Sequence, residues 1–217
     1  MSSDLGKVID VSVGSRSLRH LFTKIRDERT SVADFRKYSS RLMYIVCEEG
    51  LAYMDPQPLE VTTPTGAVYS GEKIDETNIV AVSIIRAGDS MLDAFLRVVP
   101  EAFVGKILIQ RDEETALPVL IYDKLPPLGS KKVVLCDPML ATGGSAISAV
   151  EVLVKHGANP RNIYFFNVLS CPEGLAAMAS AYPDVQVITG AIDEKLTPKK
   201  YISPGLGDYG DRFYGTV

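Results

Sequence analysis

The chain has 217 residues, of which 46% are hydrophobic and 23% charged, and its formal net charge is −4. This composition is typical of a globular protein large enough to bury a sizeable core. The acidic balance argues against nucleic acid as the main partner, and no apolar run approaches the length of a membrane span. Three scattered cysteines without a CxxC pair favour free thiols in the reducing cytoplasm.

The first 75 residues predict two helices and a strand. Ser15 and Ser31 are suitable N-caps, and apolar residues recur at helical spacing after each of them. The second helix is expected to end before Gly50, because glycine commonly follows a helix C-terminus. The alternating stretch 59–63 predicts a half-exposed strand, and a Pro-Thr-Gly turn follows it. We expect residues 1–75 to form a helical and β-arm preface to the core.

From residue 76 to 190 apolar strands alternate with helical patterns. The predicted strands are 79–85, 106–110, 119–122, 133–136, 163–169 and 185–189. Helical patterns follow the strands 79–85, 133–136 and 163–169. This alternation predicts an α/β fold with a mostly parallel sheet flanked by helices. Ligands of such folds bind beyond the carboxyl ends of the strands, so functional residues are expected there.

The most informative stretch is 133–145, VVLCDPMLATGGS, in which a buried strand leads through Asp137 and Pro138 into a glycine-rich loop and a helix. Two adjacent glycines let main-chain N–H groups point at an anion, and Thr142 and Ser145 add hydroxyl donors. Asp137 is placed to accept hydrogen bonds from sugar hydroxyls. Neither the nucleoside-triphosphate P-loop nor GxGxxG matches this stretch. It therefore predicts a phosphate site, with an ordinary βα turn as the alternative.

Two arginines directly follow predicted strands. Arg86 comes after 79–85 and Arg111 after 106–110, so both guanidinium groups can reach a ligand at the carboxyl edge. A surface position near a helix cap is the alternative for Arg86. The segment 112–130, with three prolines and few periodic apolar residues, is a candidate for a mobile cover of the active site.

The C-terminal stretch 201–213 has glycines among aromatic residues, and we expect no helix in it. Its apolar residues, which include Ile202, Leu206 and Tyr209, argue against a disordered tail. A glycine-rich loop exposes main-chain donors and acceptors. Such a loop suits recognition of the edge of a planar, hydrogen-bonding base.

Four motifs together resemble the uracil phosphoribosyltransferases, a family of type I phosphoribosyltransferases. They are SIIRAGDSM, ILIQRDEET, DPMLATGGS and YISPGLGDYGDRFYGT, and they span nearly the whole chain. The wider type I family usually has two adjacent acids at the turn, where this chain has Pro138 in place of the second. The resemblance implies one domain, 1–217, with a type I core at 76–190 and a small uracil-binding hood at 191–217. It implies transfer of the phosphoribosyl group of 5-phosphoribosyl 1-diphosphate (PRPP) to uracil, giving UMP and diphosphate in pyrimidine salvage.

The resemblance also implies roles for individual residues. Arg86 and Arg111 would hold the diphosphate, and Asp208 would lie close to both the base and PRPP, as a proton acceptor or as an orienting group. These three are the predicted catalytic residues. The main chain at Ile202, Gly207, Asp208 and Tyr209 would read uracil. The other predicted PRPP contacts are Asp137, Pro138, Met139, Leu140, Ala141, Thr142, Gly143, Gly144 and Ser145.

Magnesium is expected to be carried by the diphosphate of PRPP through water, without a direct protein ligand, because Pro138 replaces the second acid. The expected partners are PRPP and uracil, with GTP as a possible effector, and the family suggests a homodimer or homotetramer. Two alternatives stay open. One is a phosphoribosyltransferase for another base, against which YISPGLGD speaks, and the other is a PRPP-sensing regulator with little catalysis.

Overall fold

The computed structural model describes residues 6–111 and 118–216, and it describes Arg111 by its main chain only. The central sheet consists of β1 (Lys7–Asp10), β4 (Ile79–Ile85), β5 (Phe103–Arg111), β6 (Pro118–Lys124), β7 (Lys132–Cys136), β8 (Met139–Leu140), β9 (Ile163–Ser170) and β10 (Gln186–Ile192). Its order is β1–β10–β9–β7–β4–β5–β6, with β8 pairing β9. Among the described pairs of this sheet, only β5 and β6 are antiparallel. The predicted α/β class with a mostly parallel sheet is confirmed.

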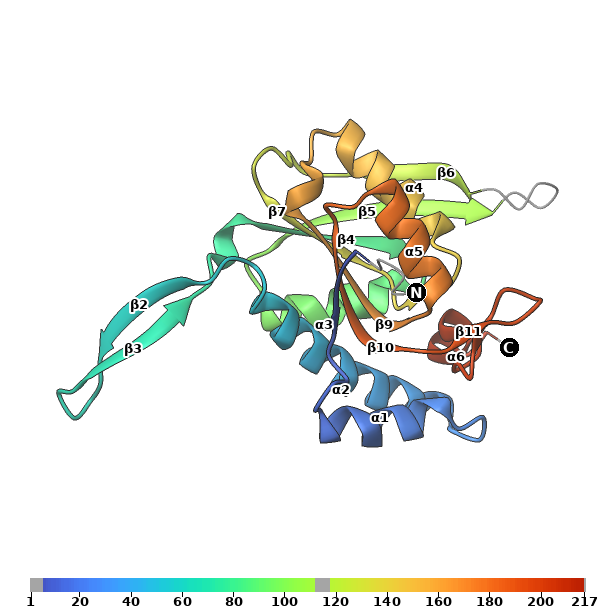
Figure 1. Cartoon of the computed structure of the whole chain (residues 1–217), viewed down its shortest axis with the longest axis horizontal. Helices are drawn as coiled ribbons and strands as arrows, with labels where there is room; N and C mark the ends of the chain where they lie inside the picture. Colours follow the sequence, from blue (N-terminus) through green and yellow to red (C-terminus); the bar gives the residue numbers. More distant parts are fainter. Residues whose placement is uncertain (1–5, 112–117, 217) are drawn as a thin grey trace.

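Helices cover both faces of the sheet (Figure 1). One face carries α1 (Arg16–Arg26), α2 (Val32–Leu51), α3 (Gly88–Val98) and the short α6 (Tyr209–Tyr214), and the other carries α4 (Gly144–Lys155) and α5 (Pro172–Ala181). Strand β4 contacts both layers, since Ala81 packs into the first core and its neighbours Val80 and Val82 into the second. Burial on both faces explains why the strand sequences are continuously apolar.

The helix starts agree with the sequence, and one helix end does not. The hydroxyl oxygens of Ser15 and Ser31 accept N–H groups in the first turns of α1 and α2. Helix α2 continues through Gly50 to Leu51, so the predicted end before Gly50 is wrong. A Cβ at Gly50 would lie 2.4 Å from Cζ of Phe166 on β9. Glycine is therefore needed here for close packing of the helix on the sheet.

A two-stranded arm, β2 (Gln57–Thr62) and β3 (Val68–Lys73), projects from the body (Figure 1). The strand pairing puts Leu59, Val61 and Tyr69 on one face of the arm, because alternate residues of a strand share a face. These three side chains are 42–61% exposed. The arm thus presents an apolar face that the rest of this chain leaves uncovered.

Two parts of the sheet differ from the sequence prediction. Strand β1 joins the edge of the sheet beside β10, although the first 75 residues were expected to lie outside it. Strand β6 forms a hairpin with β5, and Leu128 beyond it is 2% exposed in the second core. Residues 118–130 of the predicted cover are thus built into the sheet and core. Residues 112–117 lie outside the described part of the chain.

The remaining elements are short. They are the 3-10 helices η1 (Glu76–Asn78) and η2 (Pro160–Asn162) and the hairpin β11 (Lys195–Leu196) and β12 (Ile202–Ser203). In residues 6–111 and 118–216, no helix combines the length and apolar character that crossing a membrane requires. Within the described part of the chain, the peptide bonds Ile85–Arg86 and Ser203–Pro204 are cis.

Candidate active site

The glycine-rich loop leaves the carboxyl end of β7 and passes through β8 into α4. Helix α4 begins at Gly144, and Gly143 is its N-cap, with φ of 85° and no side-chain cap. The first N–H groups of a helix have no intrahelical acceptor, so an end without a side-chain cap offers them to an anion. A Cβ at Gly143 would lie 3.3 Å from the carbonyl oxygen of Gly174. Glycine is needed at this position both for its left-handed conformation and for its contact with α5.

Helix α5 supports the loop. A Cβ on Gly174 would lie 2.5 Å from the carbonyl oxygen of Ala141. The N–H of Cys171, which precedes α5, donates to the carbonyl oxygen of Leu140 at 3.3 Å. These contacts with α5 fix the conformation of the loop.

The two residues that follow β7 have different environments. The carbonyl oxygen of the buried Pro138 accepts the N–H groups of Val168 and Leu169 at 2.9 and 3.0 Å, so this residue attaches the loop to β9. Asp137 is half-buried and lines the cavity above. Burial raises the pKa of its carboxyl to about 7, against the opposing effect of the Met139 N–H at 3.4 Å. A carboxylate in this state gains from added donors such as the hydroxyls of a sugar.

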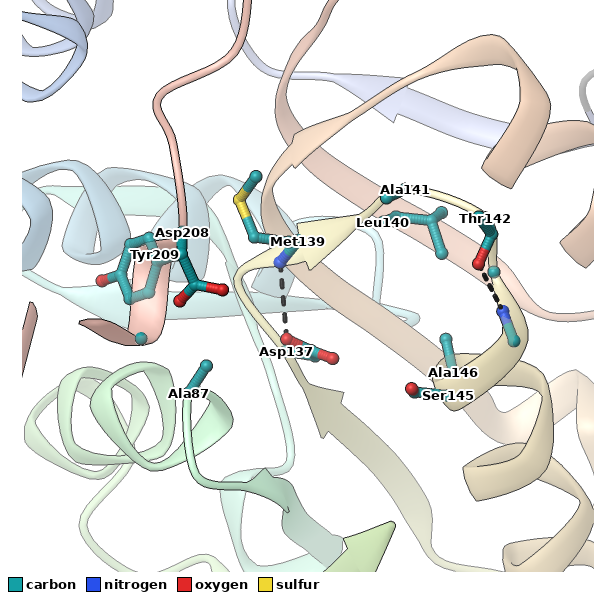
Figure 2. Close-up of a pocket in the computed structure, with 13 residues that line it drawn as sticks. Ala87, Asp137, Met139, Leu140, Ala141, Thr142, Ser145, Ala146, Asp208 and Tyr209 are labelled. Carbon is teal, nitrogen blue, oxygen red and sulfur yellow. Dashed lines mark hydrogen bonds between the residues drawn. The ribbon is translucent and has the colours of Figure 1, made fainter. Parts of the chain in front are cut away.

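A cavity of about 210 Å³ lies over the loop and the start of α4 (Figure 2), and we call it the phosphate cavity. It brings together these predicted contacts: Asp137, Met139, Leu140, Ala141, Thr142, Gly143, Gly144, Ser145 and Asp208. Ala87, from the loop after β4, Ala146, from α4, and Tyr209 and Gly210, from α6, complete its wall. Figure 2 shows Asp208 and Asp137 at the same cavity although they come from segments about seventy residues apart.

A second cavity, of about 430 Å³, lies beside the first, and we call it the base cavity. Its lining includes the predicted uracil contacts Ile202, Gly207, Asp208 and Tyr209. The two cavities share Met139, Ala141, Asp208 and Tyr209. A ligand that occupied both would be joined across this shared wall.

The base cavity is also lined by Lys199, Lys200 and Tyr201, which the sequence analysis did not single out. These residues lie between β11 and β12, at the tip of the hairpin that these two strands form. Met139 and Ala141 of the glycine-rich loop line the same cavity. Their sequence signal was two adjacent lysines directly before the glycine-rich stretch. That signal alone does not distinguish a binding residue from a solvated charge.

The C-terminal stretch contains α6, so the prediction of no helix there is wrong. The carboxylate of Asp208 caps this helix by accepting the N–H of Asp211 at 2.9 Å. The ring of Tyr209 is buried, with Phe35 at its edge and Phe213 stacked on it at centroid distances of 5.4 and 5.7 Å. The tyrosine ring therefore fixes the helix to the core, and Tyr209 also lines both cavities. Aromatic packing and a cap compensate for the poor helix propensity of Gly210.

Arg86 lies at the carboxyl end of β4, as predicted, and its guanidinium contacts the C-terminal segment. It donates to Oδ1 of Asp211 at 2.8 Å and to Oγ1 of Thr216 at 3.1 Å, and it lies over the ring of Tyr214. Hydrogen bonds from Thr216 and then from Arg86 lower the pKa of Asp211. A Cβ on Gly210 would lie 3.3 Å from Nη2 of Arg86, so the guanidinium adjoins the wall of the phosphate cavity.

Arg111 ends β5 at the same edge of the sheet, and its side chain lies outside what the structure describes. A nearby cation that the sequence analysis missed is Lys106, whose Nζ lies 2.6 Å from Oδ1 of Asp89 in the first turn of α3. The hydroxyl of Ser83 donates to the same oxygen at 2.6 Å. The available signal was a lone lysine at the start of the predicted apolar strand 106–110.

Within the described ranges, three or more His, Cys, Asp or Glu side chains nowhere gather as a metal site would require. The two carboxylates of the phosphate cavity, Asp137 and Asp208, come from different segments. This donor set fits a cation that is bound mainly by ligand oxygens and water.

The loop at the N-terminus of α4, with an acidic residue before it and a base-sized cavity beside it, defines the class: an α/β protein that binds a phosphorylated sugar next to a planar ligand. Comparison with known proteins identifies the family. Residues 12–216 match the family model described as uracil phosphoribosyltransferase. The chain therefore belongs to the uracil phosphoribosyltransferase family.

Individual relatives agree with this assignment. A uracil phosphoribosyltransferase of Dictyostelium discoideum is 47% identical, covering 93% of this chain and 94% of its own length. One of Saccharomyces cerevisiae is 45% identical and covers 99% of both chains. The solved structure of the AQ2163 protein from Aquifex aeolicus superposes with a TM-score of 0.83 at 36% identity, covering 97% of this chain and 99% of its own.

Proposed function

We propose that this protein transfers the 5-phosphoribosyl group from PRPP to uracil, giving UMP and diphosphate in pyrimidine salvage. The observation that carries the proposal is the shared wall of the two cavities at Met139, Ala141, Asp208 and Tyr209. A phosphoribosyl group in the phosphate cavity and a base in the base cavity would meet at that wall, where the new C–N bond forms. The names of relatives at 45–47% identity over nearly the full chain support the same reaction.

The phosphate cavity supplies the binding of the sugar phosphate. The main-chain N–H groups at the start of α4 and the hydroxyls of Thr142 and Ser145 hold the 5-phosphate. Asp137 accepts the ribose hydroxyls and is ionised more readily when they donate to it. Binding of remote groups in this way positions the reacting carbon at the shared wall.

The reaction develops charge on both sides of the breaking C–O bond. The sugar becomes oxocarbenium-like, and the carboxylate of Asp208 stabilises this positive charge or accepts the N1 proton of uracil. The departing diphosphate carries negative charge, and the guanidinium groups of Arg86 and Arg111 at the strand ends bind it. For Arg86 to act in this way, its guanidinium exchanges Asp211 and Thr216 for diphosphate oxygens. Magnesium carried by PRPP, without a direct protein ligand, would supply positive charge against the diphosphate.

We also propose that the chain forms a homodimer or homotetramer through the arm. Leu59, Val61 and Tyr69 form an exposed apolar face on a two-stranded hairpin, and such a hairpin has little stability alone. A second copy of the chain would cover this face. The double variant Leu59→Ser, Tyr69→Ser is expected to shift sedimentation toward the monomer, while Val68→Ser on the opposite face of the arm serves as the control.

GTP remains a proposed effector. A depression of about 600 Å³ along α1 is lined by Arg16 and Arg19, and it offers their guanidinium groups to a triphosphate. Rates of UMP formation with and without GTP, in the native chain and in Arg16→Ala, test this proposal. The cytoplasm is the proposed compartment, since Cys47, Cys136 and Cys171 are buried free thiols.

One assay tests the function against both alternatives. Radiolabelled uracil, adenine and orotate are each incubated with the protein, PRPP and magnesium, and labelled nucleotide is separated. We expect UMP from uracil, and no nucleotide from adenine or orotate. Transfer to another base would change the substrate, and absence of transfer to all three would favour a PRPP-binding regulator.

A further inference from the structure

Arg26 and Asp193 form a buried clamp on the loop that lines the base cavity. The two Nη atoms of Arg26 donate to the two carboxylate oxygens of Asp193, each at 2.7 Å. The side chain of Asp193 is 7% exposed and that of Arg26 is 24% exposed. A carboxylate this deeply buried requires such a partner, because burying an unpaired charge is costly.

The clamp holds both main-chain polar groups of Gly205. Its N–H donates to Oδ2 of Asp193 at 2.7 Å, and its carbonyl oxygen accepts from Nη1 of Arg26 at 2.8 Å. Gly205 has φ of 66°, and a Cβ there would lie 2.0 Å from the carbonyl oxygen of Ile202. The tight turn at Gly205 is therefore fixed at its donor and at its acceptor by one ion pair.

The position of the clamp relates it to the base cavity. Asp193 directly follows β10, and Gly205 follows β12, so the clamp closes the base of the excursion 194–204. The tip of this excursion carries Lys199, Lys200 and Tyr201, and Gly207 lies two residues beyond Gly205. Movement of the base of this excursion would displace one whole wall of the base cavity.

A second arginine ties the same loop to the end of α1. Nη1 of Arg212 donates to the carbonyl oxygens of Leu206 and Ile25, both at 2.5 Å, and Nη2 donates to that of Asp27 at 2.7 Å. Consecutive residues, Gly205 and Leu206, are thus attached to the C-terminal end of α1. That helix makes no part of the two cavity walls, so its contribution to the site is indirect.

We propose that Arg26 and Asp193 are positioning residues for uracil. They hold the loop 202–209, whose main chain is proposed to bind uracil, in place without touching the substrate. This inference rests on the proposed placement of uracil in the base cavity. The glycine-rich side of the phosphate cavity is built on β7, β8 and α4. Among the described residues, the side chains of Arg26 and Asp193 hydrogen-bond to each other and to Gly205, and the main-chain N–H of Asp193 donates to the carbonyl oxygen of Ser170 at the end of β9. Loss of the clamp should therefore weaken the use of uracil far more than the use of PRPP.

The test compares Asp193→Asn and Arg26→Lys with the native chain. Hydrogen bonds to charged groups are worth enough that we expect KM for uracil to rise about tenfold in Asp193→Asn. KM for PRPP should stay within about twofold, the pattern of a lost interaction with one substrate. Arg26→Lys keeps the charge but not the bidentate geometry. Its KM for uracil should therefore lie between that of the native chain and that of Asp193→Asn.

Lys132→Met is the matched control, because Lys132 is a half-buried cation at the amino end of the central strand β7, where it binds a main-chain carbonyl and Asp55. It should lower the melting temperature without raising KM for uracil. Amide hydrogen exchange of residues 201–210 is measured in all variants at a temperature where each is folded. Faster exchange in the clamp variants, together with the higher KM for uracil, supports the proposal.

The other outcomes separate two failures. Unchanged exchange with unchanged KM values would mean that the clamp does not position the loop, and the inference would be wrong while the proposed function stands. Faster exchange with an unchanged KM for uracil would mean that this loop does not read the base, which overturns both the inference and the placement of uracil. Equal increases in both KM values would assign the clamp a general structural role.

Discussion

The phosphate loop and the hood form adjoining walls of one site, but they are held in place by different means. The loop 137–145 has a local sequence signature, a strand end, two glycines and a helix start that are consecutive in the chain, and its supports on β9 and α5 lie about 30 residues away. The hood depends on distant partners, since Arg26 lies 167 residues from Asp193 and Arg86 lies 125 residues from Asp211. The hood, whose partners are more than 100 residues away in the chain, is therefore expected to respond to substitutions farther from the substrate than the loop does.

We expect catalysis to depend most strongly on a side chain of the hood, the carboxylate of Asp208. Asp208→Asn should lower kcat by about 10²–10⁴-fold, the usual contribution of a positioned acid–base group. Asparagine can still accept the N–H of Asp211, so α6 should stay capped and the melting temperature should change little. Kinetics and thermal unfolding on the same preparation check both parts.

Asp208→Ala is the companion variant, because it removes the cap as well as the charge. It should lower the free energy of unfolding by about 1 kcal/mol relative to Asp208→Asn. The N-cap contact therefore gives Asp208 a structural role beside its proposed chemical one. A kcat for Asp208→Asn within a few-fold of the native value would mean that the main chain alone carries catalysis in the hood.

A second prediction concerns Arg111, which ends β5 at the carboxyl edge of the sheet. Arg111→Ala should weaken the use of PRPP by about 1.5–3 kcal/mol, roughly 10- to 100-fold in kcat/KM for PRPP, because a charged donor to the diphosphate is lost. KM for uracil should change far less. Arg97→Ala, which removes an exposed cation from the last turn of α3, is the charge-matched control. Unchanged KM and kcat for PRPP would remove Arg111 from the site.

We expect the carboxyl of Asp137 to lower the free energy of unfolding while it serves ligand binding. Its folded pKa of about 7 lies above the ordinary value of 3.8, so the folded state binds more protons than the unfolded state between about pH 4 and 7. This carboxyl therefore lowers the free energy of unfolding as pH rises through that window. Asp137→Asn should be more stable than the native chain by about 1–3 kcal/mol at pH 8.

The expected gain from Asp137→Asn disappears near pH 4 and is constant above about pH 7. Melting temperatures of both proteins across this range, without PRPP, provide the measurement. A pH-independent difference would contradict the assigned pKa. Because the variant removes a charge from the sugar site, its KM for PRPP should rise even as its stability increases.

The smallest predicted effect sharpens the claim that the loop binds through its main chain. Ser145→Ala removes one hydroxyl donor and leaves the N–H groups of α4 in place. The loss should be about 0.5–1.5 kcal/mol in kcat/KM for PRPP, a factor of roughly 2 to 12. Gly143→Ala, which strains the left-handed N-cap, should cost more than this. The reverse order would show that hydroxyl groups carry the phosphate contact.

The same contrast explains what could be predicted from the sequence. Strands such as β4 and β7 and the phosphate loop follow from local patterns, and the structure places them as expected. Helix α6 was missed because Gly210 argues against a helix, and only the Asp208 cap and the packing of Tyr209 on Phe35 overcome this. The tie between Arg86 and Asp211 and the lysines at the base cavity depend on contacts between distant segments, which no local pattern encodes.

The most direct test of the two-part site is the calorimetric binding of ribose 5-phosphate and of UMP to the native chain and to Asp193→Asn. Ribose 5-phosphate occupies only the phosphate cavity, whereas UMP also places a base in the hood. The account predicts the same Kd for ribose 5-phosphate in both proteins and an approximately tenfold weaker Kd for UMP in the variant. An equal loss of affinity for both ligands would contradict it, because the hood and the loop would then be one structural unit.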